Sequence, residues 1–283
     1  MMGTQSFGAQ STSVTRCSLV VRTTDIWTGR PAVPSTVRVR LKGVPAAPLR
    51  TSDRSWAFLD LPHRLCDITV ESGIYLPCSQ QVDLSALAPG DPVVELFLLP
   101  GRAYVPFAAA AGIVRILVDE NGKPAAGVEV FAYVDDDQAA RGRILDEEVL
   151  PGSKTLRCVP GATKLLSGDA LAVRGKDGAP AEWFRVSPVR LSPTQLSTNE
   201  GDGLELRLDR PALHRWSRNH LLLPAAATVS DGDGWIVLPF RGRLSAGGSV
   251  RIVLRRGGKE IEDRWPLAEG KTTVMPDYVL RHS

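Results

Sequence analysis

The chain has 283 residues, of which 43% are hydrophobic and 23% charged, and its formal net charge is +3. This balance is typical of a folded globular protein of two or three domains and excludes a disordered or collagen-like chain. The net charge is too small to indicate a nucleic-acid partner, because arginine and lysine alternate with apolar residues instead of clustering.

The first residues, Met1 to Arg16, are polar and rich in serine, threonine, glutamine and glycine. They lack the apolar core of a signal peptide, and no later stretch approaches the roughly 18–20 apolar residues of a membrane helix. We therefore expect a flexible N-terminus over residues 1–15, no membrane segment and a cytoplasmic location. The cysteines lack metal-ligand spacing, so in a reducing compartment we expect free, buried thiols.

Short strand patterns separated by turn residues fill residues 16–100. Many of them alternate apolar and polar residues, as in Ile68-Thr-Val-Glu71, which indicates one solvated face for each strand. Helical patterning is limited to single turns at 85–88 and 138–141. About seven short strands with regularly spaced turns predict a β-sandwich. The expected strands are Arg16–Thr23, Ser35–Lys42, Ser55–Asp60, Cys66–Ser72, Gln80–Leu84 and Val93–Leu98.

The order of motifs in this region is also informative. A strand leads through Asp25 into the turn Thr28-Gly-Arg-Pro31, and the aromatic strand Trp56-Ala-Phe58 is followed by a Leu-Pro turn. A further strand then ends before Tyr75-Leu-Pro77. This order resembles the transthyretin-like, carboxypeptidase-regulatory type of Ig-like β-sandwich. The resemblance implies such a domain at residues 16–100.

Residues 112–134 repeat the beginning of this pattern, with two alternating strands around Asn121-Gly122. The Asn-Gly pair predicts a tight, hairpin-like turn that uses two left-handed residues. The expected continuation, a turn and an aromatic strand, comes only at residues 231–240. We therefore predict a second transthyretin-like sandwich from residues 105–141 plus 224–283, interrupted by an insertion, because insertions at exposed loop tips cost little. The alternative is three consecutive domains at residues 16–100, 105–210 and 211–283.

The inserted residues 142–223 are also β-patterned, with expected strands at Ala170–Arg174, Ala181–Val186 and Leu204–Leu208. A Gly-Asp pair precedes the first of these strands, and His220 follows the leucine-rich third strand. This order resembles the small β-barrel modules of bacteriophage tail and baseplate proteins. The predicted fold class is therefore all-β, with tandem transthyretin-like (Ig-like) β-sandwiches, the second interrupted by a small β-barrel.

The sequence contains no recognisable catalytic, cofactor-binding or metal-ligating motif. It has no nucleophile elbow and no phosphate-binding loop, and the histidines share no metal-ligand spacing: His63, His214, His220 and His282. The run Asp135-Asp136-Asp137 offers oxygen ligands for Ca²⁺ but lacks the scaffold of a calcium loop, so a solvated loop tip is favoured. Asp231-Gly-Asp-Gly234 lacks the last ligand of such a loop and is interpreted as a turn. We expect no enzyme, no cofactor and no metal site.

Two loops are the candidate interfaces. Trp183, Trp235 and Trp265 lie in strand patterns that predict core packing, whereas Trp216 lies in the arginine-rich segment Leu213–His220. Aromatic and arginine side chains are enriched at interaction hot spots. The candidate interface residues are Trp216, Arg215, Arg218 and His220 in this segment and Asp135, Asp136 and Asp137 at the loop tip.

Together these features predict a non-enzymatic structural or adaptor protein. The two resemblances imply an accessory component of a phage-tail-like contractile injection particle, with sheath, baseplate or cap subunits as partners. Self-association into a homo-oligomer is left open. The alternative is a carbohydrate- or surface-binding module, which predicts an exposed aromatic platform and calcium at Asp135. An enzyme is the third hypothesis.

Overall fold

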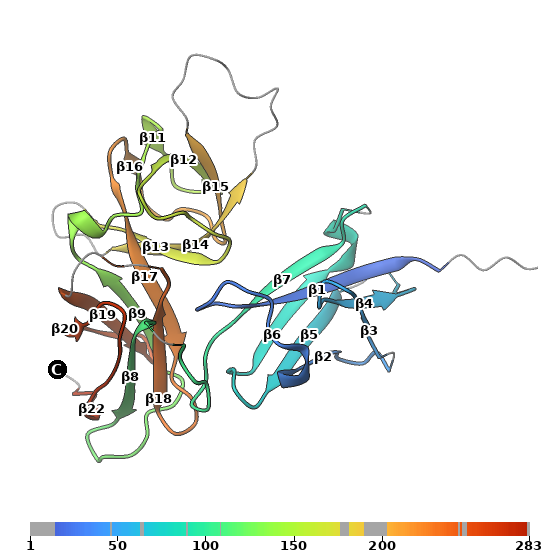
Figure 1. Ribbon diagram of the computed structural model, residues 1–283, viewed down its shortest axis with the longest axis horizontal. Coiled ribbons are helices and arrows are strands. Elements are labelled where there is room, and N and C mark those ends of the chain that lie inside the picture. Colours follow the sequence, from blue (N-terminus) through green and yellow to red (C-terminus); the bar gives the residue numbers. More distant parts are fainter. Residues whose placement is uncertain are drawn as a thin grey trace, which may run out of the picture. The chain divides into compact units, whose positions relative to one another are not determined.

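The computed structural model describes residues 15–45, 47–62, 65–88, 90–107, 109–175, 181–189, 203–242, 244 and 248–281. Within these ranges the chain is all β, as the alternating patterns predicted (Figure 1). The helical segments described there are single 3-10 turns at Pro34–Thr36, Leu84–Ala86 and Asp137–Ala139. None of them has the length and apolar character needed to cross a membrane. The expected flexible N-terminus, apart from Thr15, lies outside the described residues, as do His63 and His282.

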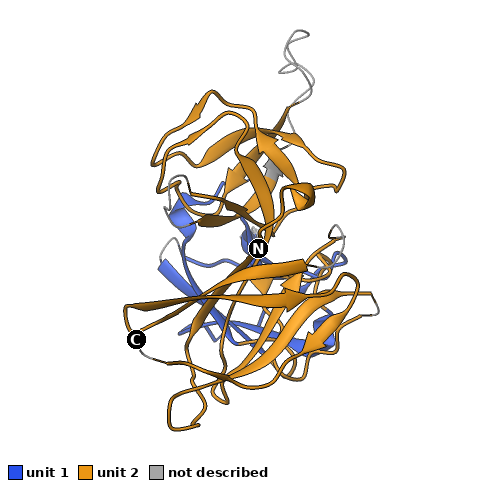
Figure 2. Cartoon of the chain, turned by 90° about the vertical axis from the view of Figure 1, so that its left-hand side faces the viewer, with its two compact units in different colours: residues 1–23, 33–71, 77–96 blue, residues 24–32, 72–76, 97–283 orange. Residues whose placement is uncertain are grey.

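The chain divides into two compact units, each assembled from separate stretches of sequence (Figure 2). Unit 1 contains Met1–Thr23, Val33–Glu71 and Pro77–Leu96, and unit 2 contains Thr24–Ala32, Ser72–Leu76 and Phe97–Ser283. The short stretches 24–32 and 72–76 therefore belong to unit 2, although most of the strands that flank them in sequence belong to unit 1.

Unit 1 is built on two sheets. One has the strand order β3 (Leu49–Arg50), β4 (Trp56–Leu59), β1 (Cys17–Asp25), β7 (Val93–Leu98), and the other has the order β2 (Val37–Leu41), β5 (Leu65–Ser72), β6 (Cys78–Asp83). Alternation is clearest in β2, whose residues are buried and exposed in turn. Trp56, Ala57 and Phe58 of β4 are all buried. Two small sheets with such buried faces are typical of a β-sandwich.

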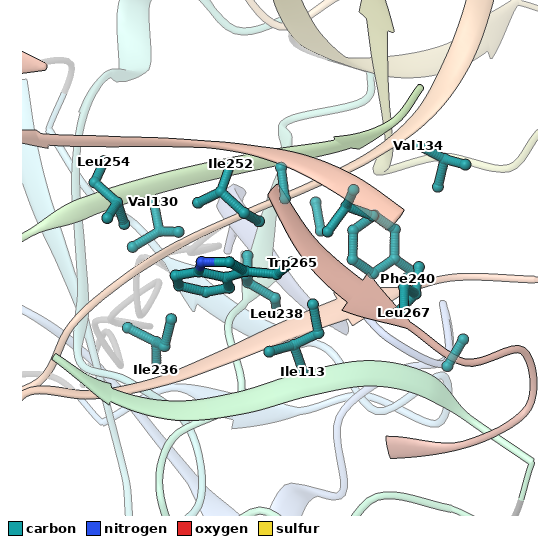
Figure 3. Close-up of a cluster of buried hydrophobic side chains, with 14 of the residues drawn as sticks. Ile113, Val130, Val134, Ile236, Leu238, Phe240, Ile252, Leu254, Trp265 and Leu267 are labelled. Atoms are coloured by element: carbon teal, nitrogen blue, oxygen red, sulfur yellow. The ribbon is translucent and has the colours of Figure 1, made fainter. Parts of the chain in front are cut away.

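Unit 2 contains a second pair of sheets that share one core. The first includes β17 (Leu221–Val229), β9 (Glu129–Val134), β19 (Gly248–Arg256) and β20 (Lys259–Leu267) as successive neighbours. The second contains β18 (Trp235–Phe240), β8 (Ala111–Val118) and β21 (Thr272–Val274), with β22 (Tyr278–Val279) also paired to β8. Figure 3 shows Trp265 between Ile113 and Ile236 on one side and Val130 and Ile252 on the other. This buried indole fills the middle of the core.

The connection between β8 and β9 differs from the sequence prediction. Gly122 has a left-handed φ of +73°, but Asn121 is not among the residues with positive φ, so the two-residue hairpin turn does not form. Asp119 instead accepts hydrogen bonds from the backbone N–H groups of Asn121 and Lys123, both at 2.9 Å. β8 and β9 lie in different sheets, and β9 pairs with β17 and β19 from much later in the chain.

Six strands of unit 2 close into a ring. The pairing runs β10 (Gly142–Ile144), β12 (Thr155–Pro160), β15 (Leu204–Leu208), β14 (Glu182–Val189), β13 (Asp169–Val173) and β17, and β10 also pairs with β17. A separate apolar cluster, which includes Leu171, Phe184 and Leu206, fills the inside. Because the ring is closed, its sheet has no free edge at which a further strand could pair.

Strand β17 belongs to both the ring and the sandwich sheet, as Figure 1 shows. Its residues Leu222–Ala225 pair with β13, and its residues Ala225–Val229 pair with β9. All residues of β17 except the two at its ends are buried, because they pack into apolar clusters of both the ring and the sandwich, as Leu222 and Ala226 do. The ring and the sandwich are therefore joined by continuous strand and not by a linker.

One carboxylate organises the segment Thr24–Ala32 of unit 2. Asp25 is buried, and its Oδ1 accepts hydrogen bonds from the backbone N–H groups of Trp27 (2.8 Å) and Thr28 (3.0 Å). Its Oδ2 accepts hydrogen bonds from the hydroxyls of Tyr75 (2.9 Å) and Tyr104 (2.6 Å). Burial raises the pKa of both tyrosines, and the Asp25 carboxylate raises it further.

Candidate functional site

The aspartate run after β9 forms a network of ion pairs. The Asp135 side chain is only 14% exposed and lies 2.8 Å from Arg174, 3.0 Å from Arg251 and 3.4 Å from Arg264. The prediction of a solvated loop tip is therefore wrong for Asp135. Its arginine partners come from positions far along the chain, which the local sequence could not indicate.

The two following aspartates have separate roles. Asp136 caps the 3-10 turn by accepting a hydrogen bond from the backbone N–H of Gln138 at 2.9 Å. Asp137 is exposed and pairs with Arg174 at 3.0 Å. The described residues hold no group of three histidine, cysteine or acidic side chains that could bind a metal ion. The run thus positions loops and arginines, and Asp136 and Asp137 remain accessible to a partner.

Trp216 is not available as a surface anchor. Its side chain is only 3% exposed and packs against Phe184 inside the ring, with ring centroids 5.2 Å apart. The cause is the short strand β16 (Trp216–Ser217), which pairs with β11 (Glu148–Val149) and turns the indole inward. The prediction that Trp216 lies at the surface is therefore wrong. Trp183 and Trp235, for which the strand patterns predict core packing, are only partly buried.

The polar candidates around Trp216 hold the same loop in place. Arg215 pairs with Glu148, and Arg218 pairs with Glu147 at 2.8 Å while donating a hydrogen bond to the backbone oxygen of Leu145 at 2.9 Å. The imidazole Nδ1 of His220 lies 2.7 Å from the backbone oxygen of Ser217. These contacts fix the backbone, and both arginines keep a large exposed fraction.

The sequence did not reveal the residue that orders the beginning of this segment. Glu182 of β14 is buried, and its carboxylate accepts hydrogen bonds from the backbone N–H groups of Leu213 (2.6 Å) and His214 (3.0 Å). Because two backbone N–H groups donate to one buried carboxylate, the loop at Leu213 and His214 is held firmly against β14. A glutamate on an alternating strand gives no sequence signal for this role, because its partners lie about 30 residues later.

An exposed apolar surface lies on this ordered loop. The loop Leu150–Ser153 is joined to it by hydrogen bonds from Gly152 N–H to the Ala212 oxygen (2.7 Å) and from Ala212 N–H to the Ser153 oxygen (2.9 Å). Leu213 is 68% exposed, and Leu150 and Arg215 are also exposed. We call the surface formed by Leu150, Leu213 and Arg215 the docking patch. It combines apolar side chains with a cation that is itself held by Glu148.

A second surface feature lies beside Trp183. A hollow of about 300 Å³ is lined by residues of β9, β14, β17 and β19 and by Arg210. Phe131 stacks on the Trp183 indole with centroids 5.3 Å apart, and the Arg210 guanidinium lies 3.9 Å from the indole centroid. Both neighbours cover indole surface that a stacking sugar would need.

No family model matches the chain, and no curated protein matches it. Among solved structures, the shaft pilin SpaA from Lactobacillus rhamnosus GG aligns with 95% of this chain and 99% of its own length, at 12% sequence identity and a TM-score of 0.24. A TM-score this low does not indicate a shared fold.

Proposed function

We propose that the protein is a non-enzymatic adaptor that binds other protein subunits through the docking patch. The observation that carries this proposal is Leu213, an exposed leucine on a loop whose backbone is held by Glu182. Burying a leucine side chain contributes about 1.5–3 kcal/mol. Because the loop is already ordered, less of this gain is lost to conformational entropy on binding.

The proposal includes the architecture and the setting. The adaptor would consist of transthyretin-like sandwiches, the second formed by residues 105–141 plus 224–283 and interrupted by a barrel at 142–223. The motif order described for the sequence supports an accessory role in a phage-tail-like contractile injection particle, assembled in the cytoplasm from sheath, baseplate or cap subunits. The continuous strand β17 supports a spacer role, because it gives the docking patch a fixed position relative to the sandwich.

The test is a pull-down of tagged protein from its native lysate, with mass spectrometry and negative-stain imaging of the eluate. Leu213→Asp should abolish co-purification, because it places a charge where the partner buries an apolar side chain. Val274→Asp is the matched control, since Val274 is 73% exposed and lies on β21, outside the ring. Particles in the wild-type and control eluates support the proposal. A monomer without partners, or equal capture by Leu213→Asp, contradicts it.

A carbohydrate- or surface-binding module is the second candidate. Its site would be the hollow beside Trp183, where the indole stays partly exposed although Phe131 and Arg210 cover part of its surface. Retention on a glycan array that is lost in Trp183→Ala would favour this function. Absence of any retained glycan, together with a melting temperature unaffected by calcium, would exclude it.

A further inference from the structure

Two arginines converge at the junction between the ring and the sandwich of unit 2. Arg141 precedes β10 of the ring and is only 5% exposed, and Arg241 directly follows β18 of the sandwich. Arg141 Nη2 donates a hydrogen bond to the backbone oxygen of Arg241 at 2.8 Å. Arg241 Nη1 donates to the backbone oxygen of Ser167 at 2.8 Å and lies 3.0 Å from Asp169. Both guanidinium groups are therefore held in place by the fold.

The charges at this junction do not balance. Asp169 is the only carboxylate in contact with the pair among the described residues, and it also accepts a hydrogen bond from Leu166 N–H at 2.7 Å. Arg141 Nη1 and Arg241 Nε have no hydrogen-bond partner in the described part of the chain. Because arginine stays protonated in proteins, two positive charges face one negative charge.

Burial makes this imbalance costly. It lowers the pKa of Arg141 and raises the pKa of Asp169, because both charged forms lose hydration. A buried charge without a full partner is destabilising, and a buried donor without an acceptor adds to that cost. An anion that accepts a hydrogen bond from Arg141 Nη1 would balance the surplus positive charge and give this donor an acceptor.

The junction also has room for an anion. A hollow of about 50 Å³ is lined by Arg141, Arg241, Thr163, Lys164 and Gly242, among other residues. Since about 10–15 Å³ suffices for one water, this space accommodates a group of phosphate size. Gly242 has a left-handed φ of +76°, which favours glycine, and a Cβ there would lie 3.2 Å from both terminal nitrogens of Arg141.

A larger pocket adjoins this hollow. It has a volume of about 570 Å³ and shares Leu166, Arg241 and Gly242 with the smaller space. Trp27, Phe107 and Phe240 contribute apolar walls. Pockets of this size commonly hold small organic ligands, so the organic part of a phosphorylated compound could be accommodated here.

We propose that Arg141 and Arg241 form an oxyanion-binding site that takes phosphate, either free or as part of a small organic ligand. The guanidinium groups supply charge-assisted hydrogen bonds to the phosphate oxygens, and Lys164 adds positive charge at the entrance. Binding would also tie the ring to the sandwich, because the two arginines come from opposite sides of the junction. The site is independent of the docking patch.

The test uses the full chain in chloride buffer, with inorganic phosphate added at constant ionic strength. Calorimetry should show saturable binding, and phosphate at a hundredfold excess over its Kd should raise Tm by about 5–10 °C, whereas chloride should not. Arg141→Met should weaken phosphate binding about tenfold or more. The matched control is Arg174→Met, which removes a partly exposed guanidinium that pairs with Asp135 and Asp137 away from the hollow, and it should leave binding unchanged.

The source of the phosphate is resolved by a second ligand. Phenyl phosphate that binds more tightly than inorganic phosphate, with no binding of phenol, indicates an organic ligand in the larger pocket. Equal affinities indicate the free anion. If Arg141→Met does not fold, Lys164→Ala provides the variant, since this exposed lysine lines the hollow and its loss removes positive charge without disturbing the core. No saturable phosphate binding to the wild type, or undiminished binding by a folded Arg141→Met variant, overturns the proposal.

Discussion

Replacing Asp25 by asparagine tests whether one buried carboxylate holds three segments of unit 2 together. The wild-type side chain accepts four hydrogen bonds, two from the backbone at Trp27 and Thr28 and two from the hydroxyls of Tyr75 and Tyr104. An asparagine side chain has the same shape, and its oxygen can still accept from both backbone N–H groups. Its NH₂ group then faces the two tyrosine hydroxyls. Each hydroxyl can accept a hydrogen bond from this group only if its own O–H bond rotates away from it.

The expected cost follows from the bonds that change. Each hydrogen bond to a charged group contributes about 1.5–3 kcal/mol. Replacing two such bonds by weaker neutral contacts should lower the free energy of unfolding by about 2–4 kcal/mol, after some relief from removing a buried charge. The effect should therefore be large compared with that of a surface substitution.

Urea denaturation measures this cost, and the chain offers a matched control. Asp231 also accepts from two backbone N–H groups, those of Asp233 (3.0 Å) and Trp235 (2.8 Å), but no tyrosine hydroxyl donates to it within the described part of the chain. Asp231→Asn keeps these bonds and should cost less than about 1 kcal/mol. Equal losses in Asp25→Asn and Asp231→Asn would refute the reasoning, because the two tyrosine bonds would then contribute nothing.

The same carboxylate predicts a dependence on alkaline pH. Burial, and then Asp25, raise the pKa of Tyr75 and Tyr104 in the folded chain above the ordinary value of about 10. The resulting stability is complete below pH 10 and is lost as the pH rises above it, because only the unfolded tyrosines ionise readily. Burial also raises the pKa of Tyr133 and Tyr278. Absorbance titration of the native protein should therefore show all four tyrosines ionising above pH 10, with Tyr75 and Tyr104 the most resistant. Normal titration of all tyrosines in the native state would contradict this.

Three further substitutions or reactions test the core and the backbone. Trp265→Ala should cost about 3–5 kcal/mol in urea unfolding, because the indole is buried between two sheets, and a loss below 1 kcal/mol would contradict the described core. Gly234→Ala should lower the free energy of unfolding by about 2 kcal/mol or more, since Gly234 has φ +75° and an added Cβ would lie 2.3 Å from a carbonyl oxygen of β8. Gly232→Ala is the control, because its Cβ meets open space and the substitution should be tolerated. Burial raises the pKa of the Cys158 thiol to about 12. At pH 8 this thiol should therefore react with Ellman's reagent far more slowly than the partly exposed Cys17, until urea unfolds the chain. Equal reaction rates of the two thiols in the native protein would argue against this burial.

Alternation of apolar and polar residues predicted the strands well. The expected strands Val93–Leu98 and Leu204–Leu208 have the same bounds as β7 and β15, and the expected strand Ala170–Arg174 is shifted by one residue from β13. A period of two residues is a local property, because successive side chains of a strand point to opposite faces. The all-β class therefore follows from the sequence alone.

The candidate site depended on contacts that no local pattern encodes. The arginines around Trp216 in the sequence predict a surface anchor, but pairing of β16 with β11 places this residue inside the ring. The acidic neighbours of Asp135 predict a solvated side chain, yet its partners Arg174, Arg251 and Arg264 come from three later segments. Only the three-dimensional pairing of distant strands decides which face such residues occupy.

The position of β9 between β17 and β19 has a consequence for synthesis of the chain. β9 ends at Val134, whereas β17 begins at Leu221, so about 90 residues must be translated before the first of its two neighbours exists. At 5–20 residues per second, the apolar stretch Val130–Val134 has both edges unpaired for roughly 4–20 s. Such strands are prone to associate with other chains. The aspartates at 135–137 act as gatekeepers here, because negative charge beside a nascent apolar strand opposes aggregation until its partners emerge.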